Sequence, residues 1–134
     1  YRRVALDVVK VGESSWFEPA LGSYYEDAEL AGRLRSAGFR ALSVPAARAL
    51  HAGSATAGST RWPLVYGNRH LAAARLLGRG YWLALPRLLV RDVADLLGVI
   101  LRGEGGRALG ILRGLWRAAT KLRRFVHLGA GMAS

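Results

Sequence analysis

The chain has 134 residues and no cysteine, which suits one domain or a domain fragment with a tail, and excludes disulfides and cysteine-based zinc sites. The first residue is tyrosine and no signal-peptide pattern follows, so we expect the true N-terminus to be missing. Of the formal charge of +11, residues 1–60 contribute seven basic and six acidic residues, and residues 61–134 contribute thirteen and three. Only the second part therefore predicts an anionic partner: nucleic acid, anionic lipid or a phosphorylated substrate.

The first predicted element lies within residues 2–11, whose valines and leucine fit either a short helix or a strand. Glycine, proline and serine in residues 12–23 predict a loop. Residues 26–37 predict a helix, because apolar side chains recur there at helical spacing. Gly38 suits the position after this helix, since glycine adopts the left-handed conformation without strain.

Two short apolar runs follow, residues 39–44 and 47–51, and Pro45 ends the first of them. Both runs predict strands, because short apolar stretches bounded by turn residues are typical of strands. The small and polar residues 51–60 then predict a loop. A helix followed by two strands indicates that residues 1–60 form a mixed α/β unit.

Residues 61–134 are predicted to form a basic helical tail. Its first helix includes Pro63, which is well tolerated in a first turn, and runs to about Leu77. Two glycines within residues 78–80 break this helix, and residues 107–126 predict the last one.

The segment from Tyr81 to Leu101 is just long enough, at about twenty residues, to cross a bilayer. However, ionised residues at the centre of a span cost about 2.5–3.5 kcal/mol each. Arg87, Arg91 and Asp95 follow one another at intervals of four residues, so they share one side of a helix. The segment therefore predicts a packed or interfacial helix with one wet side, which Pro86 starts or kinks.

The last predicted helix is amphipathic and basic. Its basic stripe consists of Arg113, Arg117, Lys121 and Arg124, and its apolar side consists of Leu112, Leu115, Trp116, Ala119, Leu122 and Phe125. A basic amphipathic helix with tryptophan and phenylalanine is typical of binding to a membrane surface. The alternative is a solvated face on a helix that packs against the rest of the protein.

Several short motifs resemble one known family. They are Tyr24-Tyr25-Glu26-Asp27-Ala28-Glu29-Leu30, Arg33-Leu34-Arg35, Ala37-Gly38-Phe39-Arg40, Val44-Pro45 with Ala47 and His51, and Tyr66-Gly67-Asn68-Arg69-His70-Leu71. In this order they resemble the inverting GT-A glycosyltransferases, especially the rhamnosyltransferase-like enzymes of bacterial cell-surface polysaccharide synthesis. The resemblance covers roughly residues 12–77.

The resemblance implies an α/β fold, namely the C-terminal part of a GT-A (nucleotide-diphospho-sugar transferase) fold followed by a helical tail. Residues 1–60 would be the acceptor-side part of the catalytic domain and residues 61–134 the tail. The family holds its metal and sugar diphosphate with an Asp-x-Asp motif upstream of this region, and no such motif occurs here. The resemblance therefore implies that the nucleotide-binding half is missing.

The implied activity is transfer of a sugar, with inversion, from a nucleotide-sugar donor to a polysaccharide or lipid-linked acceptor. The implied cofactor is a divalent metal, manganese or magnesium, held mostly by the missing N-terminal half. With the basic tail, the implied location is the cytoplasm, peripheral to the inner face of the membrane. On this reading the isolated chain is an inactive part of the enzyme.

By resemblance, Asp27 is the base that takes a proton from the acceptor hydroxyl. Glu26, Tyr25 and Trp16 would bind the substrate, because acids orient hydroxyls and aromatic rings stack on sugars. His51 would complete the metal site or bind the diphosphate. From the residues alone, Asp27 has a second reading as an ordinary acid at the start of a helix.

Two further functions remain open. The basic tail is compatible with a non-enzymatic module that binds nucleic acid in a salt-dependent manner. This reading is disfavoured, because no nucleic-acid-binding motif occurs and the basic residues alternate with many leucines and tryptophans. The chain would otherwise be a degenerate glycosyltransferase fragment without activity.

Overall fold

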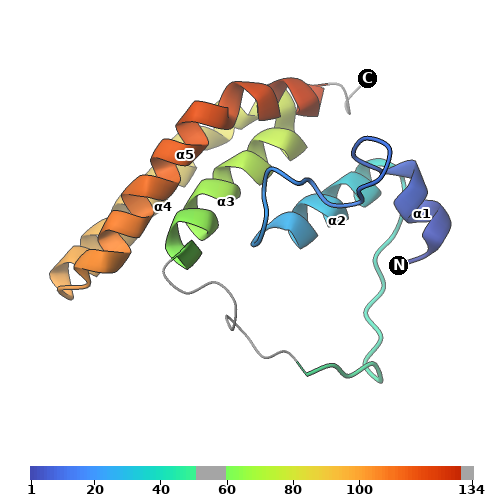
Figure 1. Ribbon diagram of the computed structural model, residues 1–134, viewed down its shortest axis with the longest axis horizontal. Helices are drawn as coiled ribbons and strands as arrows, with labels where there is room; N and C mark the ends of the chain where they lie inside the picture. The colour runs from blue at the N-terminus through green and yellow to red at the C-terminus, as the bar shows by residue number, and fades with distance from the viewer. Residues whose placement is uncertain (51–59, 131–134) are drawn as a thin grey trace.

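The computed structural model describes residues 1–50 and 60–130, and every regular element in this part of the chain is a helix (Figure 1). In chain order these are α1 (Arg3–Val8), α2 (Glu26–Ser36), α3 (Arg61–Leu77), the 3-10 turn η2 (Gly78–Gly80), α4 (Tyr81–Leu101) and α5 (Gly105–Ala130). α4 and α5 form an antiparallel hairpin that packs beside α3, while α1 and α2 lie together at the other end of the molecule (Figure 1).

The predicted α/β fold is wrong, and with it the C-terminal part of a GT-A fold. The described part of the chain holds no strand, and its only β feature is an isolated bridge between Val11 and Ser15. Residues 39–50, expected to contain two strands, are irregular and largely exposed, with Leu42 82% accessible. A strand requires a neighbouring backbone to complete its hydrogen bonds, and no described segment offers one here.

The helices follow the sequence more closely. α2 and the break at Gly78–Gly80 are confirmed, and the first apolar segment is a helix, α1. Pro86 was expected either to start the main helix or to kink it; α4 begins at Tyr81 and contains Pro86, so the first alternative is wrong. The last helix is longer than predicted and begins at Gly105, two residues after Gly103, whose φ of +70° turns the chain between α4 and α5.

The main packing contact joins α3 and α5. Their backbones meet where Gly67 faces Gly114, and a Cβ on Gly114 would lie only 2.7 Å from the carbonyl oxygen of Pro63. Around this crossing lies a cluster of buried apolar side chains, comprising Leu21, Leu71, Ala74, Tyr81, Ala118, Phe125 and Val126. The small residues allow the two helices to approach closely, so the position of the α4–α5 hairpin is set by its contact with α3.

A smaller cluster joins α1 to α2 through Ala5, Val9, Leu30 and Leu34. Within the described residues, no helix is both long enough and apolar enough to cross a membrane.

Candidate functional site

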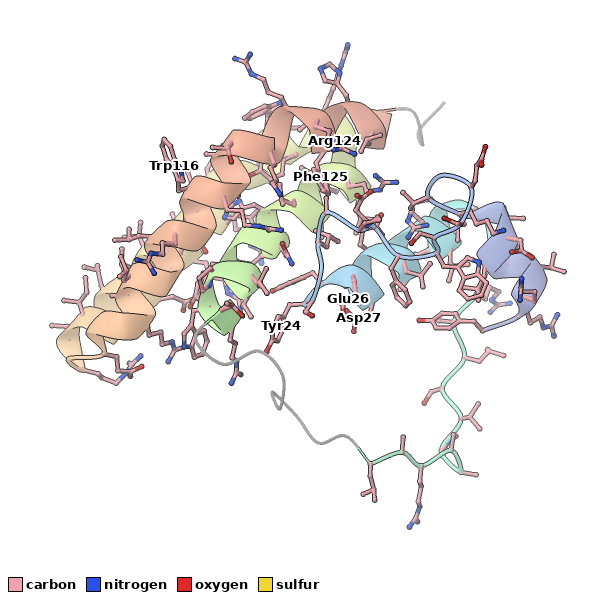
Figure 2. The ribbon with its side chains drawn as sticks, viewed as in Figure 1. Tyr24, Glu26, Asp27, Trp116, Arg124 and Phe125 are labelled. Carbon is pink, nitrogen blue, oxygen red and sulfur yellow. The ribbon has the colours of Figure 1, made fainter. Side chains whose placement is uncertain are left out.

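Asp27 lies in the first turn of α2, as predicted. Its side chain is exposed, and one carboxylate oxygen accepts a hydrogen bond from the Ala28 backbone N–H at 2.7 Å. The neighbouring Glu26 is half-buried and points the same way from the helix start (Figure 2). The geometry fits the local role of an acid that stabilises a helix N-terminus. The role of Asp27 as a base in sugar transfer stays a prediction.

The two aromatic residues predicted to bind substrate, Tyr25 and Trp16, lie beside α2 and α1 respectively. Tyr25 occupies the position before α2 with a φ of +68°, in the left-handed region. The Trp16 indole N–H donates to Asp7 at 3.4 Å, and the Arg3 guanidinium lies 4.9 Å from the centre of its ring. Trp16 therefore packs with α1.

The predicted metal ligand, His51, lies outside the described residues. Within them, no three His, Cys, Asp or Glu side chains are grouped as metal ligands. The manganese or magnesium ion, assigned mainly to an absent N-terminal half, stays a prediction.

Glu29 of α2 is buried, although an acid on a helix is normally exposed to solvent unless it is paired. The side chain is fully buried and lies between two arginines, with Arg33 at 2.7 Å and Arg75 at 2.6 Å. Arg75 also pairs with the buried Glu18 at 2.9 Å. Because α2, α3 and the loop before α2 each supply a partner, these charges bind residues 18–36 to α3.

Asn68 holds the loop that leads into α2. Its side-chain nitrogen lies 2.7 Å from the carbonyl oxygens of Leu21 and Ser23 and 2.9 Å from that of Tyr24. Its side-chain oxygen accepts a hydrogen bond from Arg117 of α5. Arg117 was predicted to lie on the basic stripe of the last helix. It is half-buried, and its guanidinium group is hydrogen-bonded to Asn68 in the interior.

A buried polar cluster joins α3 to α4. The His70 ring contacts the Tyr81 hydroxyl at 2.7 Å through Nδ1 and Asp92 at 2.6 Å through Nε2, and Arg69 pairs with the same carboxylate. Burial, and secondarily the Arg69 cation, lower the pKa of His70 to about 4, while burial raises the pKa of Tyr81 to about 12. A neutral His70 that donates to Asp92 and accepts from Tyr81 satisfies all three groups. The cluster fixes the direction in which α4 leaves α3.

The most unusual feature of the surface is an apolar stripe on α4. At the helical rotation of about 100° per residue, its side chains fall within about a third of the helix circumference and so share one side. They are Trp82, Leu83, Leu89, Val90, Val93, Leu97, Ile100 and Leu101, and all are exposed, Leu83 to 88%. Sequence reasoning found the charged side of α4 but missed this stripe.

α5 continues the apolar surface with Leu109, Leu112 and Trp116, of which Trp116 is 73% accessible. In Figure 2 Trp116 points away from α3. On α4 and on α5, a rotation of about a third of a turn around the helix axis leads from the buried side to the exposed apolar side chains. Viewed along each helix from its N-terminus, the direction of this rotation is the same. Because α4 and α5 run antiparallel, both stripes fall on the same side of the hairpin. We call this surface, formed by the eleven residues named here and in the preceding paragraph, the outer face.

Exposed arginines border the outer face. The same helical geometry places Arg87 and Arg91 beyond its edge on α4, and Arg113 and Arg124 beyond its edge on α5. None of the four forms an ion pair within the residues that the structure describes. The hairpin therefore presents an apolar surface with an unneutralised cationic border on both sides.

Comparisons with known proteins add no relative: no family model, no curated protein and no solved structure matches this chain. Together with the all-helical arrangement of the described residues, this overturns the identification as a member of the GT-A glycosyltransferases. The short motifs around Asp27 are therefore a local likeness, and sugar transfer stays a prediction.

Proposed function

We propose that this chain binds the surface of an anionic membrane through the outer face of its α4–α5 hairpin, with both helices lying in the interface. The observation that carries the proposal is the continuous exposed apolar stripe bordered by unpaired arginines. Apolar patches of this extent mark interaction sites. The combination of leucine and tryptophan with flanking arginine is the pattern of helices that lie in a membrane interface.

Both components would contribute to the free energy of binding. Burying a leucine side chain fully contributes about 1.5–3 kcal/mol, and a basic residue near an anionic leaflet contributes about 1 kcal/mol. Trp82 and Trp116 suit the headgroup level, where the amphipathic indole ring is favoured. A nucleic acid would bind the arginines through its phosphates but would leave the apolar stripe exposed to water. A membrane would contact both the arginines and the apolar stripe, and it is therefore the better partner for the outer face.

The test is co-sedimentation of the whole chain with neutral and anionic vesicles, at low and high salt. We expect binding to anionic vesicles that weakens with salt, because charges at a surface are screened within about 8 Å at physiological ionic strength. Leu97→Glu and Trp116→Glu should each lower the affinity about tenfold or more, since each removes an apolar contact and adds a repelled charge. Leu42→Glu is the control: Leu42 is also exposed, to 82%, but lies outside the hairpin.

Equal binding of the Leu97→Glu variant and the parent chain would overturn the proposal. So would salt-sensitive binding to nucleic acid without binding to vesicles. If the outer face joins two copies of the chain, the same substitutions would abolish self-association in the absence of lipid, which sedimentation equilibrium would detect.

A further inference from the structure

A hollow of about 500 Å³ lies at one end of the hairpin, where α4 begins and α5 approaches its end. It is lined by Arg79, Trp82, Arg123, Val126 and His127. Trp82 also belongs to the outer face, so the hollow opens beside the surface that we propose for membrane binding. We call it the basic hollow.

The basic hollow carries positive charge without a counter-charge. Arg79 and Arg123 are exposed, and neither forms an ion pair within the described part of the chain. No acid lines the hollow, and α5 has no acidic residue at all. The first acid along α4, Asp92, lies about three turns from Tyr81 and is buried against Arg69 and His70. Two free guanidinium groups suit a phosphate, which they bind with paired N–H donors.

The rest of the lining is apolar. Val126 is buried, and the Trp82 indole packs edge-on against Tyr81 with ring centres 5.5 Å apart. Tyr81 is itself fixed by its hydrogen bond to His70, so Trp82 rests on an ordered neighbour. An inorganic phosphate would gain nothing from these side chains. A phospholipid would place its phosphate on the arginines and its first methylene groups on Trp82 and Val126.

We infer that the basic hollow binds the phosphate of a membrane phospholipid and prefers a terminal phosphate monoester to a diester. The inference rests on the proposed function, because the lipid reaches the hollow only when the outer face lies on the membrane. The preference follows from charge: a phosphate monoester carries about −1.5 to −2 at neutral pH, and two arginines compensate that charge better than the single charge of a diester.

The experiment compares phosphatidylcholine vesicles containing either phosphatidic acid or phosphatidylglycerol, matched in surface potential. We expect the whole chain to bind the phosphatidic acid vesicles about tenfold more tightly. In Arg79→Gln/Arg123→Gln the affinity should fall and the preference should disappear. The matched control is Arg91→Gln/Arg113→Gln, which removes two exposed arginines from the border of the outer face. It should weaken binding to both compositions by the same factor, about fivefold per arginine, and keep the preference.

The outcomes separate the two proposals. Binding to both vesicle types without a preference, or a preference that survives Arg79→Gln/Arg123→Gln, would overturn the basic hollow and leave the proposed function intact. Absence of binding to any vesicle would overturn the proposed function. In that case NMR titration with soluble dihexanoyl phosphatidic acid still tests the hollow, through the signals of His127 and the Trp82 indole. Equal shifts and affinity with inorganic phosphate would instead identify a site for free phosphate and overturn the lipid assignment.

Discussion

Replacing Gly114 with alanine should destabilise the protein, although the same change normally stabilises a helix. In a helix interior alanine is favoured over glycine by about 1 kcal/mol. At Gly114, however, the added methyl group would lie 2.7 Å from the Pro63 carbonyl oxygen and 2.9 Å from the Gly67 nitrogen, whereas ordinary contact begins at 3.4 Å. Both neighbours are backbone atoms of α3 and cannot rotate away. The helices must therefore separate.

Overpacking of this kind costs about 1–3 kcal/mol, and a clash between two backbones belongs at the upper end. After the gain in helix propensity, the net loss should be about 2 kcal/mol. For a chain of this size that corresponds to a fall in Tm of roughly 8 °C. Thermal and urea unfolding followed by circular dichroism at 222 nm would measure both quantities.

Gly98→Ala provides the matched control for this substitution. Gly98 lies inside α4, and the nearest atom to its added Cβ is the end of the flexible Arg102 side chain, at 3.3 Å. We expect this variant to be more stable than the parent by up to about 1 kcal/mol. A Gly114→Ala variant that is also more stable than the parent would refute the close contact between α3 and α5.

Glu29→Gln should lower the free energy of unfolding, measured by urea titration, by about 3 kcal/mol or more, because it leaves the buried Arg33 and Arg75 without their shared carboxylate. As a control, Glu13→Gln at an exposed position should change the free energy of unfolding little. The pKa of His70 is lowered from 6.5 to about 4 in the folded chain, so between these pH values the unfolded chain binds the proton more readily. The contribution of a neutral His70 to the free energy of unfolding should therefore be complete above pH 6.5. As the pH falls from 6.5 to about 4, that free energy should decline by up to about 1.4 kcal/mol per pH unit. Urea titrations across this pH range should give a flatter profile for His70→Gln than for the parent, and identical slopes would count against the neutral imidazole. Finally, the isolated chain should not transfer sugar from a nucleotide-sugar donor in the presence of manganese or magnesium, because it lacks an Asp-x-Asp motif to hold the metal. Sugar transfer by the chain that is abolished by Asp27→Asn would contradict this prediction.

The helices were predictable from local signals. Leu30 and Leu34 share one side of α2, and Gly78 and Gly80 end the regular run of α3. The prediction of strands in residues 39–50 failed because strands, unlike helices, are not determined by local signals. A strand depends on a partner elsewhere in the chain, and an apolar run such as Phe39 to Val44 does not reveal whether that partner exists.

The candidate site was predictable only in part. The basic amphipathic character of α5 follows from spacing, but spacing did not reveal that Trp116 on its apolar side is exposed whereas Phe125 on the same side is buried. The burial of Glu29 and the interior role of Arg117 could not be read from composition, because charged residues are normally exposed unless a partner is present. The outer face of α4 was missed because its leucines and valines have the composition of a core. Which apolar side of a helix remains uncovered depends on the neighbouring helices.

The tie between Asn68 and the loop before α2 also has a consequence for the order of folding. Tyr24 and Tyr25 both have positive φ, a conformation that costs a non-glycine residue about 1–3 kcal/mol. The side chain that compensates this cost lies more than forty positions later in the sequence, and it is itself held by Arg117 of α5. The loop can therefore reach its final shape only after α3 and α5 have met. Amide hydrogens in the loop should gain protection late in refolding, and Asn68→Ala should expose them while α3 and α5 remain paired.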